Sequence, residues 1–236
     1  NSKISLDAEI YNQIFNTENK LISSDNYKTG SYYRLFPILG ISTESPFKLK
    51  KYKSNLTFKP SLHVVVTPGI SNSNRLSNED STNNDFSLNN IYALNRYSGN
   101  DKMDNSKRIT FGLSAYTLNF NTNLYQSYEF TNNSNFHKEQ GNDDNLSDLL
   151  GSIEYSKNNK ISYDFRYDSN ESYLKKQNIS LDTYTKYGDI NLSYLDENSK
   201  TNNIITKDTE TINYSFLSKK FSKFSKINLS GLYDLK

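Results

Sequence analysis

The chain contains no cysteine and no tryptophan, and only one methionine, two histidines and four prolines among its 236 residues. Without cysteine, no disulfide can form within the chain. No apolar run approaches the roughly 18 residues of a membrane-spanning helix, which excludes a helical membrane protein. The net charge of +2, from 28 basic and 26 acidic residues, shows no excess of one sign that would indicate a nucleic-acid partner.

Hydrophobic residues make up only 34% of the chain, and Tyr (19) and Phe (13) are prominent among them. Their spacing is more informative than their number. From Lys160 to Asp168, apolar and polar residues alternate, so Ile161 and Phe165 share one face of an extended strand and Ser162 and Asp164 share the other. Such repeated dyads are typical of a soluble antiparallel sheet or of a membrane barrel that is apolar outside and polar inside.

The alternation recurs along most of the chain and predicts about eleven strands. Their lengths cluster near the roughly 9–11 residues that a tilted strand needs to cross a bilayer. The predicted ranges are 2–14, 30–42, 54–67, 107–117, 119–130, 149–157, 160–168, 174–184, 188–195, 204–217 and 225–235.

The predicted connections tend to alternate between long and tight. Long ones are expected at 15–29, 68–106, 131–148, 168–174 and 196–203, and tight ones at 117–119, 158–159 and 185–188. Connections of eleven residues at 43–53 and of moderate length at 218–224 fit the short set less well. Outer-membrane barrels carry long loops on the extracellular rim and short turns on the other, so this pattern favours a barrel.

Residues with catalytic or metal-binding potential are few. His63 lies in a predicted strand and His137 in a predicted loop, and neither belongs to a zinc-binding or nucleophile motif. The acidic groups around Glu79, Asp101 and Asp143 lack EF-hand spacing and are interpreted as solvated loop charge. We therefore expect no enzyme, no metal and no cofactor.

One segment is similar to the signature region of a known family. Residues 77–113 contain Asn95-Arg96-Tyr97-Ser98-Gly99, Asp101-Lys102, Asp104, Arg108, Thr110 and Phe111-Gly112-Leu113. This order resembles the conserved phrase of the LPS-assembly outer-membrane protein family LptD. Tyr33-Arg34-Leu35-Phe36-Pro37, Lys59-Pro60 and Asn145-Leu146-Ser147-Asp148 resemble further family segments, whereas Lys102, Ser106 and Lys59 depart from the family pattern.

The resemblance implies an all-β fold: an antiparallel transmembrane β-barrel in the outer membrane of Gram-negative bacteria, of which residues 1–236 are one segment. It implies transport of lipopolysaccharide (LPS) to the outer leaflet, a plug lipoprotein LptE inside the barrel, and a periplasmic LptA-type bridge that delivers LPS. We expect the family's N-terminal jellyroll and its terminal gate strands to lie outside this chain.

Two sets of site residues follow. The loop that carries the family motif is expected to lie over or in the extracellular mouth, either as a structural clasp in which Arg96 pairs with Asp101 or Asp104, or as a substrate contact. Its motif residues are Asn95, Arg96, Ser98, Gly99, Asp101, Arg108 and Gly112. The polar half of the dyads predicts lumen-facing side chains at Ser162, Asp164, Arg166, Asn191, Ser193, Asn213 and Ser215.

Alternative functions are a porin or uptake channel, a rim hydrolase, or a soluble secreted β-sandwich adhesin.

Overall fold

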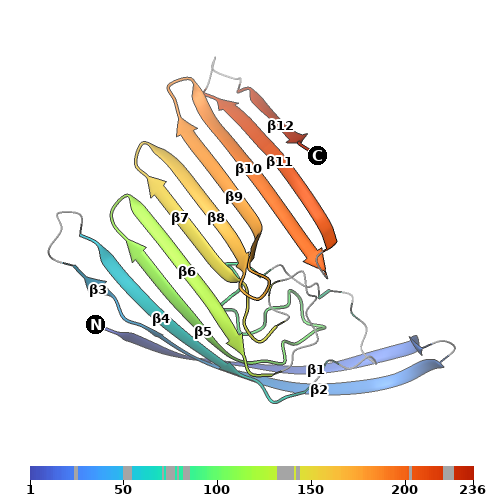
Figure 1. Ribbon diagram of the computed structural model, residues 1–236. Coiled ribbons are helices and arrows are strands. Elements are labelled where there is room, and N and C mark those ends of the chain that lie inside the picture. The colour runs from blue at the N-terminus through green and yellow to red at the C-terminus, as the bar shows by residue number, and fades with distance from the viewer. Residues whose placement is uncertain are drawn as a thin grey trace. The chain divides into compact units, whose positions relative to one another are not determined.

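The computed structural model describes residues 1–23, 26–49, 55–70, 72, 78, 80–81, 86–131, 141, 144–201, 204–219 and 226–236. Over these residues the fold is all-β (Figure 1). The strands are β1 (Lys3–Ser23), β2 (Asn26–Glu44), β3 (Phe47–Lys48), β4 (Thr57–Val66), β5 (Lys107–Tyr116), β6 (Phe120–Glu129), β7 (Leu149–Ser156), β8 (Asn159–Asp168), β9 (Tyr173–Tyr184), β10 (Gly188–Thr201), β11 (Ile204–Ser218) and β12 (Asn228–Asp234).

The strands form one sheet in which each is hydrogen-bonded to its neighbours in chain order. The order is β1-β2-β4-β5-β6-β7-β8-β9-β10-β11-β12, and the two-residue β3 pairs with β4. The registers that the structure gives are all antiparallel. Within the described residues, β1 and β12 do not pair with each other, so the sheet is open.

The chain divides into two compact units. Unit 1 comprises residues 1–45, 61–111 and 126–147, and unit 2 comprises residues 46–60, 112–125 and 148–236. Unit 1 contains β1, β2 and the long β4–β5 connection. Unit 2 contains the whole of β7 to β12.

All eleven predicted strands are present, most with ends within three residues of the prediction. Two predicted long loops are wrong. β1 continues to Ser23 and β2 begins at Asn26, so most of 15–29 is strand. β10 likewise continues to Thr201, so most of 196–203 is strand. Cross-strand pairs such as Asn16–Ser31 hold these polar extensions in the ladder, although their sequence does not alternate.

Unit 1 has an apolar core on one face of its strands only. Phe36, Ile38, Val65 and Met103 are almost fully buried together, with Leu94 packed against them. Met103 and Leu94 come from the β4–β5 connection, so this loop covers one face of β2 and β4. On the opposite face the apolar side chains are left exposed.

Candidate functional site: two sheet faces and a buried loop clasp

The strand register of unit 2 places apolar side chains beside apolar side chains across the strands. Two cross-strand rows two residues apart show this. The first row is Tyr155, Ile161, Leu181, Leu192, Tyr214 and Gly231, and the second is Ile153, Tyr163, Ile179, Tyr194, Ile212 and Tyr233. Because the rows coincide from strand to strand, they form one continuous apolar band.

The band is exposed, and its height is limited. Ile161 is 50% exposed and Leu192 45% exposed. A further row holds Thr183, Ile190, Phe216 and Leu229. The band ends at the next row on its other side, where side chains become polar: Phe165 pairs with Gln177, and Gln177 pairs with Asp196. Since a two-residue step along a strand is about 7 Å, three rows span about 14 Å and four rows about 21 Å along the strand, somewhat less than the roughly 25 Å apolar band of outer-membrane barrels.

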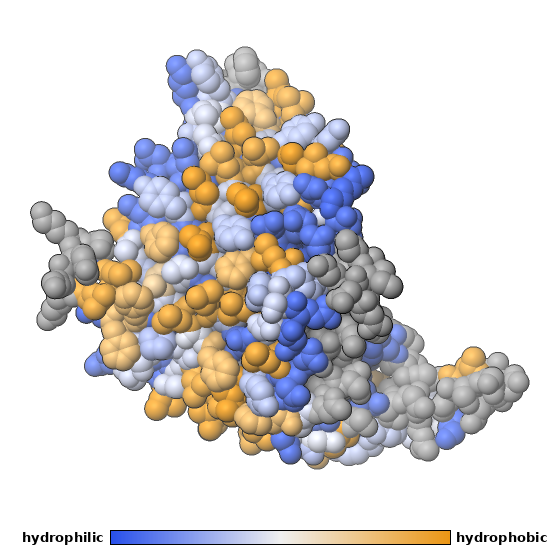
Figure 2. Space-filling view, viewed as in Figure 1, coloured by the Kyte–Doolittle hydropathy of each residue, from blue (hydrophilic) through white to orange (hydrophobic). Residues whose placement is uncertain are grey.

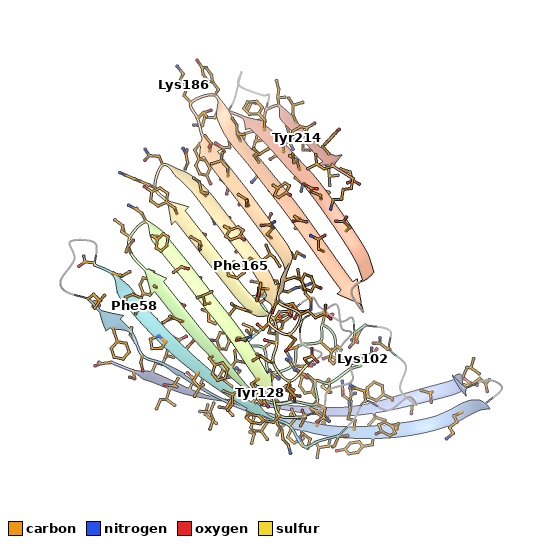
Figure 3. All side chains as sticks on the ribbon, viewed as in Figure 1. Phe58, Lys102, Tyr128, Phe165, Lys186 and Tyr214 are labelled. Atoms are coloured by element: carbon orange, nitrogen blue, oxygen red, sulfur yellow. The ribbon has the colours of Figure 1, made fainter. Side chains whose placement is uncertain are left out.

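The figures show the same distribution of side chains. In the space-filling view, hydrophobic side chains are spread over the strands, and hydrophilic ones gather toward the end of β10 and the start of β11 (Figure 2). Phe165 and Tyr214 lie within strands, whereas Lys186 lies at the β9–β10 turn (Figure 3). The apolar band therefore lies between polar margins.

The other face of unit 2 is built from hydroxyl, amide and carboxylate side chains. One cross-strand row reads Asn121, Glu154, Ser162, Ser180, Ser193 and Asn213, and the next reads Ser156, Lys160, Asp182, Asn191, Ser215 and Ser230. These side chains bond to one another across strands. The Ser162 and Ser180 hydroxyl oxygens lie 2.6 Å apart, and the Asn191 amide donates to Asp182 at 2.6 Å. The register thus brings the residues predicted to be lumen-facing onto one polar face. Asp164 and Arg166 lie on the same side of β8 as Ser162, because alternate residues of a strand share a face.

Arg166 differs from its neighbours on this face because it is buried among charges. Its Nε lies 3.5 Å from Asp148 Oδ2. The Lys175 ammonium lies 3.3 Å from Asp148 Oδ2 and 2.7 Å from Asp168 Oδ2. Asp148 immediately precedes β7, and burial raises its pKa to about 6 although Lys175 acts in the opposite direction. Two acids and two bases therefore connect the start of β7 to β8 and β9, and the family-like Asp148 is at their centre.

In unit 1 the family motif forms a buried ion-pair network. Arg96 Nε donates to Asp104 Oδ2 at 2.5 Å, and its Nη2 donates to Glu129 Oε2 at 3.1 Å. Arg108 Nη1 reaches the same Asp104 oxygen at 3.1 Å, and Ser106 donates to Glu129 at 2.5 Å. Burial by itself would lower the pKa of Arg96, but the carboxylates of Asp104 and Glu129 raise it above the ordinary value. We call Arg96, Asp104, Arg108 and Glu129 the loop clasp.

The turn at residues 99–101, between Arg96 and Asp104 of the loop clasp, is held by side chains from other parts of the chain. Asp80 accepts the backbone N–H groups of Asn100 and Asp101 at 2.9 to 3.0 Å, which lowers its pKa. Arg34 donates to the backbone carbonyls of Asn100 and Asp101 at 2.6 and 2.7 Å. Gly99 has φ of +77°, and a Cβ there would collide with the Asp80 carbonyl, so the turn requires glycine.

The remaining motif residues lie in the loop or in β5. Asn95 accepts the backbone N–H of Asp104 at 3.0 Å, which closes the loop on itself. Ser98 is half-buried beside the turn, and Gly112 lies within β5. The predicted pairing of Arg96 with Asp104 is confirmed, whereas the participation of Arg108 and Glu129 was not predicted. Arg108 is only four residues from Asp104 in the sequence, whereas Glu129 reaches the loop because β6 pairs with β5.

The expected acidic loop groups are only partly described. Glu79, Asp85, His137 and Asp143 lie outside the described residues. Asp80 accepts the protein's own backbone N–H groups. The interpretation as solvated loop charge is wrong for Asp104 and Asp148, because both are buried and pair with guanidinium or ammonium groups. Over the described ranges, no group of three or more His, Cys, Asp or Glu side chains is arranged to hold a metal ion. The described part of the chain also has no helix with the length and hydrophobicity that a membrane crossing requires.

Comparison with known proteins agrees with the motif residues. The family described as "LptD: LPS transport system D" matches residues 1–236. Among solved structures, a mutant of Rh. blastica porin is similar over 99% of this chain and 100% of its own, with 10% identity and a TM-score of 0.30. No curated protein sequence matches the chain. Because the family match extends over all 236 residues, the chain belongs to the LptD family of LPS transport proteins.

Proposed function

We propose that this chain forms part of the wall of an outer-membrane β-barrel that inserts LPS into the outer leaflet. The observation that carries the proposal is the register of unit 2, which joins apolar side chains into one exposed band and polar side chains into the opposite face. In a soluble protein an exposed band of this extent would favour aggregation. Against lipid it is the required surface.

The polar face suits a water-filled interior. Its serine, asparagine and carboxylate side chains can bond water, sugar hydroxyls or the surface of a plug lipoprotein such as LptE. Lipid-exposed open sheet edges do not occur in a bilayer, so we infer that further strands complete the wall beside β1 and β12. LPS would enter from a periplasmic LptA-type bridge, its headgroup passing the polar face while its acyl chains stay near lipid. The protein moves its substrate and has no catalytic role in this scheme.

Single-cysteine labelling tests the assignment of the faces. Because this chain contains no native cysteine, each variant has one thiol and all labelling of the chain comes from the introduced position. Ser193→Cys and Leu192→Cys are adjacent in β10 but lie on opposite faces. In outer-membrane vesicles, a small hydrophilic thiol reagent should modify the cysteine at position 193. The cysteine at position 192 should react only with a membrane-soluble reagent. The opposite pattern, or equal labelling by the hydrophilic reagent, would refute the proposal.

A photo-crosslinking amino acid tests the substrate. Placed at Ser193, it should capture LPS or the plug lipoprotein in living cells. Placed at the lipid-facing Leu192, the same amino acid should crosslink neither the plug lipoprotein nor LPS that passes through the barrel interior. Loss of LPS from the cell surface on depletion of the protein is the functional control. If crosslinks at Ser193 contain only porin-type solutes or no partner, the translocation proposal fails while the barrel assignment stands.

A further inference from the structure

A recess in unit 1 lies outside the apolar band and the loop clasp. It is about 280 Å³ in volume. The side chains that give it its chemistry are Asp7, Ser42, Glu44, Ser61, His63 and Tyr92, and we call it the Tyr92 recess. In register, Ser42 pairs with His63 and Glu44 with Ser61, so these four side chains belong to one face of β2 and β4.

One side of the recess is a tyrosine ring held in a fixed position. The Tyr92 hydroxyl lies 2.7 Å from the Ser61 hydroxyl, and its ring centroid lies 5.5 Å from that of His63 with the planes at 48°. Tyr92 comes from the β4–β5 connection, directly after the fully buried Ile91. The loop clasp anchors the same connection, so the ring does not need to be ordered when a ligand arrives.

The polar groups around the ring are acceptors and hydroxyls. Asp7 and Glu44 supply carboxylates, and Ser42 and Ser61 supply hydroxyls that can donate or accept. His63 is only 3% exposed, and its Nδ1 has no hydrogen-bond partner among the described residues. A buried polar atom of this kind requires a partner, which a ligand or water can provide.

The chemistry of the recess selects for one class of ligand. None of the described residues that line it is Lys or Arg, and its two carboxylates would repel a phosphate or carboxylate anion. A sugar has hydroxyls that donate to carboxylates and an apolar C–H face that packs on a tyrosine ring. The volume lies just below the range of about 300–1,000 Å³ typical of ligand pockets, which suits a single sugar residue.

We propose that the Tyr92 recess binds one neutral or amino sugar residue, with the Tyr92 ring under the sugar face and Asp7 and Glu44 accepting its hydroxyl or ammonium hydrogens. The identification of this sugar as part of the LPS glycan rests on the proposed function. Binding of the sugar itself does not depend on transport. The recess would thus be a glycan contact selective against the phosphorylated and acidic parts of the same molecule.

Saturation-transfer NMR on the full protein in detergent tests the proposal with three probes: methyl glucoside, methyl glucosaminide and galacturonic acid. The first two should give signal and the third should not. Tyr92→Ala should weaken binding by about tenfold, a loss of one decade in affinity, while Tyr92→Phe keeps the ring and should retain most of it. Tyr187→Ala removes an exposed ring at the β9–β10 turn and serves as the matched control.

Several results would overturn the proposal. They are absence of signal from both methyl glycosides, equal signal in the Tyr92→Ala and Tyr187→Ala proteins, preference for galacturonic acid, and binding of Mg²⁺ alone that Glu44→Gln abolishes. Each variant is checked for native strand content by circular dichroism. If Tyr92→Ala fails this check, Glu44→Gln replaces it, and unchanged binding of the glucosaminide then refutes the site. Sugar binding without LPS translocation would refute the proposed function and leave the recess standing.

Discussion

Asp104→Asn is the sharpest test of the loop clasp. The Asp104 side chain is fully buried and lies between two arginines, with Oδ2 at 2.5 Å from Arg96 and 3.1 Å from Arg108. Asparagine has nearly the same shape but no charge. The substitution removes the carboxylate that the two buried guanidinium groups share, while Glu129 still pairs with Arg96.

The size of the effect follows from burial. Removing one partner of a buried ion pair costs about 3–5 kcal/mol, because a charge is left uncompensated. That corresponds to about two to three and a half orders of magnitude in the unfolding equilibrium constant. The measurement is urea unfolding of the full protein in detergent micelles, followed by circular dichroism. The midpoint should fall well below that of the parent protein.

Glu154→Gln is the matched control. Glu154 pairs with Lys160 at 2.9 Å, but both side chains are more than a third exposed, so the loss should stay below about 1 kcal/mol. Adding Arg108→Met to Asp104→Asn should recover part of the stability, because Arg108 loses its carboxylate partner whereas Arg96 keeps Glu129. If Asp104→Asn costs no more than Glu154→Gln, or if the double variant shows simple additivity, the clasp is not the strong buried network inferred here.

Three further predictions concern the lipid face, the loop turn and a buried acid. Ile161→Arg should cost about 2–4 kcal/mol near the bilayer midplane while Asp164→Arg should cost little; equal assembly yields in vesicles would contradict the face assignment. Gly99→Ala should cost on the order of 1–3 kcal/mol through its positive φ and the backbone collision. Gly30 also has a positive φ, +152°, but a Cβ there meets no neighbouring atom, so Gly30→Ala should cost less, and urea midpoints compare the two. Asp148 has a pKa raised by burial to about 6, so the folded protein binds a proton that the unfolded chain releases at lower pH. Its contribution to stability should be complete below about pH 4 and be lost as pH rises through 6. Parent and Asp148→Asn midpoints that differ by a constant amount from pH 4 to 7 would refute this.

The strand pattern could be predicted because it depends on local periodicity. β8 spans 159–168 where alternation predicts 160–168, and the other strands of unit 2 follow the same rule. A period of two specifies which side chains share a face whatever the partner strand. The strand extensions beyond Phe15 and beyond Leu195 were missed because their residues are polar on both faces. Pairing with the neighbouring strand, and not alternation, keeps them extended.

The loop clasp shows the limit of local inference. The motif indicates that Arg96 needs an acid and leaves Asp101 and Asp104 as equal candidates. Their chemistry is the same, and only the path of the loop distinguishes them. In the structure Asp101 lies at the turn beside Asp80, with Arg34 on its carbonyl, while Asp104 turns inward to Arg96.

By itself, the sequence determined an all-β chain with one apolar and one polar side to most strands, since side-chain alternation is a property of the extended backbone. Tertiary structure alone decided that these sides line up from strand to strand as a continuous band, because that requires a specific register. It also brought Glu129 to Arg96, and it assembled the Tyr92 recess from β1, β2, β4 and the β4–β5 connection. Such contacts depend on how strands pair and where a loop folds back, and neither is encoded in any short run of residues.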